Sequence, residues 1–231
     1  MNSATLPVVV ALSIQFLLGL IVFQSNWQRK ANQAFLLLSI ITAGWLGCLY
    51  FAIGTRNMRI AELAIREASL FGGLILLALN VLRVALTERH PTWAQIFRRN
   101  LLWFVLSAAV AVFCQTRFFL RGIQLSDSTG AIMPLYARYA PVYFACFVGC
   151  GLAVIVSYIR DAKRATADKK TELTFILIGA AVAVGSTVLS FILGLFVDKS
   201  RLVWLAPSRI VLFSLIISYG IATRKIMDVG L

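Results

Sequence analysis

Seven apolar stretches run through this 231-residue sequence, and each is about as long as a helix that crosses a bilayer, roughly 17 to 25 residues. Hydrophobic residues do not alternate with polar ones inside them, which argues against an outer-membrane β-barrel. Charged residues make up 13% of the chain, about half of the share typical of soluble domains. The sequence therefore predicts an all-α, polytopic membrane protein built as a seven-transmembrane helix bundle. The expected spans are 6–23, 33–53, 68–86, 101–118, 139–159, 173–197 and 203–223.

The loop charges give this bundle a direction. Residues 1–28 have no charged side chain and lack the basic start and cleavage site of a secretory signal, so we expect a retained first helix with its N-terminus outside. In this N-out/C-in arrangement, twelve Lys and Arg residues lie in the inner loops and tail, nine lie in the outer loops, and five of the six lysines are inside. The net charge of +13 sits in short loops beside apolar helices. That placement favours anionic membrane lipids, rather than nucleic acid, as partners.

The longest outer loop, 121–134, has its own pattern. Ser, Asp, Thr and Gly residues at 126–130 are typical of a turn, and short apolar segments lie on both sides of them. This arrangement predicts a short outer β-hairpin that caps the mouth of the bundle. Small residues predict where helices approach each other closely. They are Gly72, Gly73, the pair Ala145 and Gly149, the pair Gly179 and Ala183, and Gly185 with Ser186.

Arg209 is the most unusual residue of the apolar stretches. Counted from the inner end of the last span, it lies about 20 Å up the helix, or roughly 10 Å inside the outer boundary. A charge at that depth is costly and is expected to face the interior with a partner. The alternative is that the helix begins at Ser208, just after Pro207, and that the arginine extends to the headgroups.

Four further residues are candidates for a ligand site together with Arg209. Arg66 and Glu67 are expected to open the third helix, and Glu67 could neutralise Arg209 or Arg138 across the bundle. These residues predict a polar, anion-attracting pocket at the outer mouth. The alternative is an ordinary rim of interfacial charges.

Asn80 joins this list because of its spacing. Arg66, Gly73 and Asn80 are seven residues apart and should share one face of the third helix. We therefore count Arg66, Glu67, Asn80, Arg138 and Arg209 as ligand-binding candidates.

The sequence offers little for catalysis, metals or cofactors. Cys146 and Cys150 lie four residues apart and could form a thiol pair for redox or metal sensing, although buried packing is the favoured interpretation. His90 is the only histidine, and we interpret it as a solvated loop residue. Metalloprotease, P-loop and nucleophile-elbow motifs are missing, and no carboxylate lies in the middle of a span. We expect no enzymatic activity, no metal and no cofactor.

Three segments together resemble a known family. They are RKANQAF at 29–35, which leads to Trp45; KKTEL at 169–173, followed by Gly179; and YGIATRKIMDV at 219–229. Their order and spacing are similar to those in the N-terminal seven-transmembrane sensor region of bacterial histidine kinases. In that family an Asn…Phe…Trp pattern opens the second helix, and an Arg- and Met-Asp-containing segment follows the seventh.

The resemblance implies a function and a location. It implies a sensory domain at 1–223 in the bacterial cytoplasmic membrane and, at 224–231, the start of a linker to a cytoplasmic output module. Because the sequence ends at Leu231, we expect either part of a longer signalling protein or a stand-alone relative. The ligand would be an unidentified small molecule or lipid, and a homodimer is expected by analogy. The alternatives are a small transporter or channel, and a membrane enzyme or assembly factor.

Overall fold

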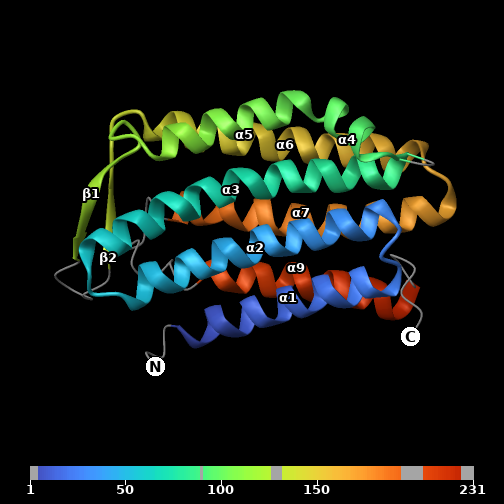
Figure 1. The fold of residues 1–231 in the computed structure, drawn as a ribbon, viewed down its shortest axis with the longest axis horizontal. Coiled ribbons are helices and arrows are strands. Elements are labelled where there is room, and N and C mark those ends of the chain that lie inside the picture. Colours follow the sequence, from blue (N-terminus) through green and yellow to red (C-terminus); the bar gives the residue numbers. More distant parts are fainter. Residues whose placement is uncertain (1–4, 89–90, 126–131, 194–204, 225–231) are drawn as a thin grey trace.

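The computed structural model describes residues 5–88, 91–125, 132–193 and 205–224. The described chain is mostly helical (Figure 1). Its helices are α1 (Leu6–Ser25), α2 (Lys30–Gly54), α3 (Met58–Thr87), α4 (Trp93–Arg99), α5 (Leu101–Cys114), α6 (Ala140–Arg164), α7 (Ala167–Leu193) and α9 (Leu205–Arg224). The predicted turn at 126–130, His90 and most of the linker at 224–231 lie outside the described residues.

Several of these helices are suited to a bilayer. Within the described residues, five are long and apolar enough to cross one: α1, α2, α3, α6 and the Lys169–Ser190 part of α7. Helices α4 and α5 meet this description only as a pair, and the pair is bent by 67°. The apolar part of α9, Pro207–Gly220, is shorter. The fold is therefore that of a multi-pass membrane protein.

The helices form two layers with nearly parallel axes (Figure 1). One layer contains α1, α2, α3 and α5 in chain order, and the other contains α6, α7 and α9. Helix α1 begins at the end of the bundle that carries the two strands, whereas α9 ends at the opposite end. We call these the hairpin end and the α9-exit end.

The predicted hairpin is confirmed as a two-stranded antiparallel sheet. Strand β1 (Leu120–Leu125) pairs with β2 (Ile132–Tyr136), and Leu120 lies opposite Tyr136. The pairing is irregular between Leu120 and Gly122. Phe119, which precedes β1, is fully buried and contacts the rings of Phe113, Tyr136 and Tyr143, so an aromatic cluster attaches the sheet to α5 and α6.

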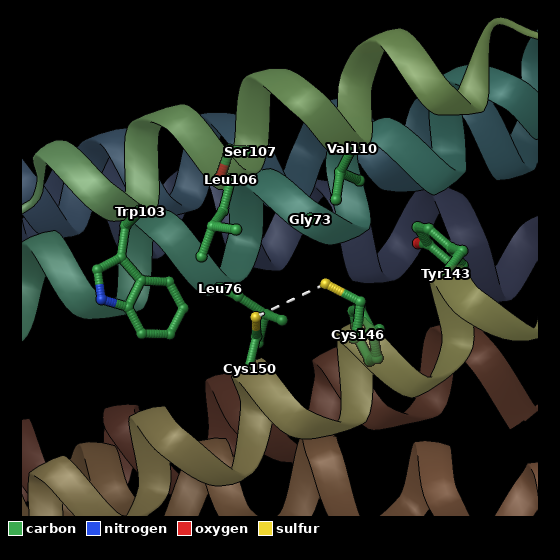
Figure 2. A pocket seen from close by; sticks show the side chains of 10 residues that line it. Gly73, Leu76, Trp103, Leu106, Ser107, Val110, Tyr143, Cys146 and Cys150 are labelled. Atoms are coloured by element: carbon green, nitrogen blue, oxygen red, sulfur yellow. Dashed lines mark hydrogen bonds between the residues drawn. The ribbon is translucent and has the colours of Figure 1, made fainter.

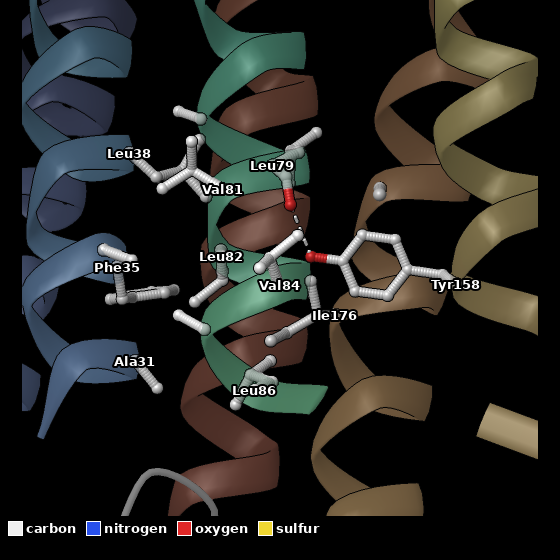
Figure 3. Close-up of a cluster of buried hydrophobic side chains, with 14 of the residues drawn as sticks. Ala31, Phe35, Leu38, Leu79, Val81, Leu82, Val84, Leu86, Tyr158 and Ile176 are labelled. Atoms are coloured by element: carbon white, nitrogen blue, oxygen red, sulfur yellow. Dashed lines mark hydrogen bonds between the residues drawn. The ribbon is translucent and has the colours of Figure 1, made fainter. Parts of the chain in front are cut away.

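The main core lies between the two layers toward the α9-exit end. Phe35 of α2 and Leu82 of α3 are fully buried there (Figure 3). Tyr158 of α6 is also fully buried, and its hydroxyl donates to the carbonyl oxygen of Leu79 at 2.8 Å. A buried hydroxyl in an apolar core needs such a partner, because leaving it unbonded would cost several kcal/mol in hydrocarbon.

Two expectations about helix boundaries are wrong. Helix α3 begins at Met58, ten residues earlier than expected, so Arg66 and Glu67 lie in its third turn rather than at its start. Asn57 supplies the real N-cap, because its side chain accepts from the backbone N–H groups of Arg59 and Ile60. The fourth span ends at Cys114 instead of residue 118 and follows the separate short helix α4.

The predictions from small residues are partly confirmed. A Cβ added at Gly179 would lie 2.7 Å from the ring of Phe213, and one at Gly73 would lie 3.1 Å from Val110. Helices α7 and α9, and helices α3 and α5, therefore approach closely at these positions. A Cβ added at Gly149 or Gly185 would meet no atom of another residue within 4 Å, and Ala145 is exposed. These positions therefore do not mark contacts among the described helices.

Candidate functional site

Arg209 lies on α9 and faces α7. Its two terminal nitrogens donate to the hydroxyl oxygens of Thr187, at 3.2 Å, and Ser190. Both hydroxyls are held in place, because each also donates to a carbonyl oxygen one turn earlier in α7. A cation inside the α7–α9 contact is thus held by two neutral groups.

The guanidinium of Arg209 has N–H donors that form no hydrogen bond. Of its five N–H donors, the Nε–H is buried and has no hydrogen-bond partner. No carboxylate among the described residues forms an ion pair with it. The nearest carboxylate in sequence, Asp198, lies outside the described residues. Arg209 therefore has hydrogen-bond donors left for an anion.

Arg66 is in the opposite state. It is 8% exposed, and all five of its donors are used. The Nε and one terminal nitrogen donate to Glu62 at 3.2 and 2.9 Å. The other bonds, at 2.7–3.0 Å, reach the carbonyl oxygens of Cys114, Thr116 and Leu120. Arg66 therefore joins the end of α5 to the start of β1 and has no donor left for a ligand.

Glu67 and Arg138 do not reach Arg209. The Glu67 carboxylate accepts from the side chain of Gln115 at 3.0 Å, and Arg138 is exposed after β2. Among the described residues, no hydrogen bond or ion pair connects Arg209 with Arg66, Glu67 or Arg138. The expected neutralisation of Arg209 or Arg138 by Glu67 is therefore not found among the described contacts.

Asn80 belongs to a different part of the molecule. It is 2% exposed and donates to Asn100, which lies at the bend between α4 and α5, at 2.6 Å. It also accepts from the Nε of Arg83 at 2.9 Å, and Arg83 forms an ion pair with Asp161 of α6. Asn80 thus connects three elements toward the α9-exit end. The expectation that Arg66, Gly73 and Asn80 share a face is confirmed, because all three face α4 or α5.

Ser214, a fully buried polar residue of α9, was not predicted from the sequence. Ser214 donates to Gln15 of α1 at 2.6 Å, and Gln15 donates to Ser39 of α2 at 3.0 Å. All three side chains are fully buried. One glutamine inside an apolar span was the available signal, since such a residue is expected to bond across helices. Helix α9 is therefore held by polar contacts at two depths, to α7 and to α1.

The α9-exit end is joined by charged contacts. Arg29, before α2, forms a bidentate ion pair with Glu172 of α7 at 3.0 and 2.8 Å. Lys169 donates to the carbonyl oxygens of Thr87 and Glu88 at 3.1 and 3.0 Å, which satisfies the C-terminus of α3. These bonds connect the α1–α2 turn, the end of α3 and the start of α7.

Comparison with protein families and with curated protein sequences gives no match to this chain.

Proposed function

We propose that this chain is a membrane-embedded sensory domain that detects an anionic ligand or a membrane state at Arg209 and passes the change through α9 to a cytoplasmic output module. The observation that carries the proposal is the cation in the α7–α9 contact, held by two hydroxyls and with a buried, unbonded Nε–H. Such a charge is costly in a membrane and is a functional site by default. The family-like segments described above support the same class.

The mechanism is a shift of population between two arrangements of α9. A ligand moves such an equilibrium only by its difference in affinity for the two states. An anion at Arg209 would favour the state in which the remaining donors face it, and would weaken the bonds to Thr187 and Ser190. Because α9 also bonds α1 through Ser214, a displacement at one depth changes the packing at the other. In this mechanism the other helices are held in place by the contacts of Arg66, Glu67 and Asn80.

The topology belongs to the same proposal. All seven apolar segments, including the bent α4–α5 pair and α9, cross the bacterial cytoplasmic membrane, with the N-terminus outside and the C-terminus inside. The opposite placement of the start of α1 and the end of α9 supports an odd number of crossings. Reporter fusions within the α6–α7 connection should be active only as cytoplasmic reporters, and fusions within 126–131 only as external ones. Reversed activities would contradict the orientation.

The experiment joins residues 1–231 to a histidine kinase output module and measures transcription from its target promoter. Arg209→Ala should abolish the transcriptional response to the ligand or membrane state while leaving expression of the protein intact. Arg209→Lys should retain part of this response because a cation remains. Asp198→Asn should leave the response in place. An unchanged response in Arg209→Ala would overturn the assignment, and loss of the response in Asp198→Asn would show that Arg209 has an internal carboxylate partner.

Binding gives an independent measurement. The purified chain should be stabilised against heat by phosphatidylglycerol or by inorganic phosphate, since a ligand that binds only the folded state raises its stability. Arg209→Gln should lose the stabilisation by whichever of these two anions acts. Stabilisation that is equal in both proteins would place the anion site elsewhere.

A further inference from the structure

A narrow cavity lies between α3, α5 and α6, about halfway along the bundle (Figure 2). It is lined by Gly73 and Leu76 of α3, Trp103 and Ser107 of α5, and Cys146 and Cys150 of α6. We propose that the two cysteines of this cavity form a binding site for a soft monovalent cation of the Cu⁺ or Ag⁺ class. This site is separate from Arg209 and does not depend on the sensory function.

The two thiols converge on each other. Their Sγ atoms are 4.0 Å apart, and both side chains point from α6 into the cavity toward α5 (Figure 2). Each cysteine is only half-buried, and neither belongs to one of the buried hydrophobic clusters. Both thiols therefore lie at the wall of the cavity and outside the buried clusters of the described residues.

A disulfide fits this geometry poorly. Residues four apart on a helix have Cβ atoms about 5–6 Å from each other. A disulfide needs a Cβ–Cβ distance of roughly 3.5–4.5 Å. Because both cysteines lie inside the regular helix α6, closing the bond would require a local distortion of that helix. The pair is better placed to share a ligand than to bond to itself.

A shared metal ion fits without such a distortion. A metal–thiolate bond is about 2.3 Å long, so sulfurs 4.0 Å apart subtend about 120° at a common ion. A linear arrangement needs a separation of about 4.6 Å. A change of about 0.6 Å in the sulfur–sulfur distance, from rotation of either cysteine side chain within the cavity that both line, would reach it.

The ligand set selects the class of ion. In the described part of the chain, no group of three or more His, Cys, Asp or Glu side chains could hold a metal. Zinc, which takes four ligands in structural sites, would be incompletely bound here. Thiolate sulfur prefers soft ions such as Cu⁺. One thiolate neutralises a monovalent ion with the release of one proton, and the second sulfur completes the coordination, so the apolar cavity holds a neutral complex.

The test uses Ag⁺ as a redox-stable probe on the full chain, purified in detergent and reduced. After loading, the protein is washed with an excess of glutathione, which removes silver from isolated cysteines but competes poorly with two sulfurs on one helix. The wild type should retain about one silver ion per chain. Cys150→Ser and Cys146→Ser should each bind roughly 100-fold more weakly. Cys48→Ser, a half-buried cysteine outside the pair, should behave as the wild type.

A second variant and a direct measurement separate binding from folding. Cys150→Met keeps a soft sulfur ligand and should restore part of the retention that Cys150→Ser loses. X-ray absorption of the loaded wild type should show two sulfur neighbours on the silver ion. The proposal is overturned if the wild type retains no silver, if Cys150→Ser retains as much as the wild type, or if the absorption spectrum shows a single sulfur.

Discussion

At the scale of single residues, two arginines have opposite hydrogen-bonding states. All five donors of Arg66 are bonded, three of them to backbone carbonyl oxygens. Arg209 has two bonds to hydroxyls and a buried Nε–H without a partner. A fully bonded arginine stabilises the structure around it, whereas one with spare donors can still recognise an anion. The two residues therefore belong to different classes.

The structural role of Arg66 leads to a stability prediction. Arg66→Ala would leave the carbonyl oxygens of Cys114, Thr116 and Leu120 without this donor, and Glu62 without its cation. A buried acceptor left without a donor costs about 1–3 kcal/mol, whereas the carboxylate of Glu62, which is 35% exposed, can be solvated. We expect a clear drop in the thermal unfolding midpoint of the purified protein. Arg66→Lys should recover little, because an ammonium cannot reach three carbonyls and a carboxylate in the same fork.

Arg138 provides the matched control for Arg66. It is an exposed arginine near the same hairpin, so Arg138→Ala should change stability by no more than about 0.5 kcal/mol. Equal unfolding midpoints for Arg66→Ala and Arg138→Ala would contradict the role assigned to Arg66.

At the scale of helices, close approach depends on which glycines face a neighbour. A Cβ at Gly19 of α1 would lie 2.5 Å from the Cβ of Ser39 on α2, whereas a Cβ at Gly149 of α6 would meet nothing within 4 Å. Gly19→Ala should therefore push α1 from α2 and lower the stability by roughly 1–3 kcal/mol. Gly149→Ala should stabilise by about 0.4–1 kcal/mol, because alanine restricts the unfolded chain.

Chemical unfolding of the two variants in the same detergent measures this difference. Gly19→Ala should also disturb the bond from Gln15 to Ser39, so the loss should shrink in a Ser39→Ala background, where the hydroxyl is gone. If both alanine variants unfold like the wild type, α1 and α2 are not in the close contact described.

The sequence predicts elements better than contacts, for a physical reason. An apolar run of bilayer length is a local property, so the approximate positions of the apolar helices could be predicted from it. The hairpin could be predicted from another local signal, the turn residues at 126–130 and their apolar flanks. The early start of α3 was missed because Met58–Ile65 carries charged residues and its N-cap signal is one asparagine. The carbonyl partners of Arg66 lie 48 to 54 residues away, and the bonding state of an arginine depends on such distant groups. Expected depth in the membrane grouped Arg66 with Arg209, and the three-dimensional contacts give the two residues different partners.

At the scale of the whole molecule, the family-like segments meet at one end. Asn32, in the first segment, is fully buried and donates to the carbonyl oxygen of Val22, which joins the end of α1 to α2. Arg29 of the same segment pairs with Glu172 of the second. Phe175, just after the second segment, contacts the ring of Tyr219 in the third. The described parts of these three segments thus lie together at the α9-exit end.

The Arg29–Glu172 pair allows this junction to be tested as a unit. Its side chains are 24% and 10% exposed and form two hydrogen bonds, so it should contribute more than a surface ion pair. Arg29→Glu and Glu172→Arg each place like charges together and should destabilise the protein. The double exchange should restore much of the loss, with a coupling free energy of roughly 1–3 kcal/mol in a double-mutant cycle measured by chemical unfolding.

The pair Arg99 and Glu88 is the control for this exchange, because it lies at the same end and Arg99 is 60% exposed. Its coupling should be about 0.2–1 kcal/mol and should decrease in high salt. In the kinase fusion, the single Arg29 and Glu172 variants should change the basal output, because they alter the surroundings of the α9 exit, whereas variants of the control pair should not. If the two pairs show equal coupling and equal output, the junction around α9 is an ordinary charged rim and has no part in the proposed output.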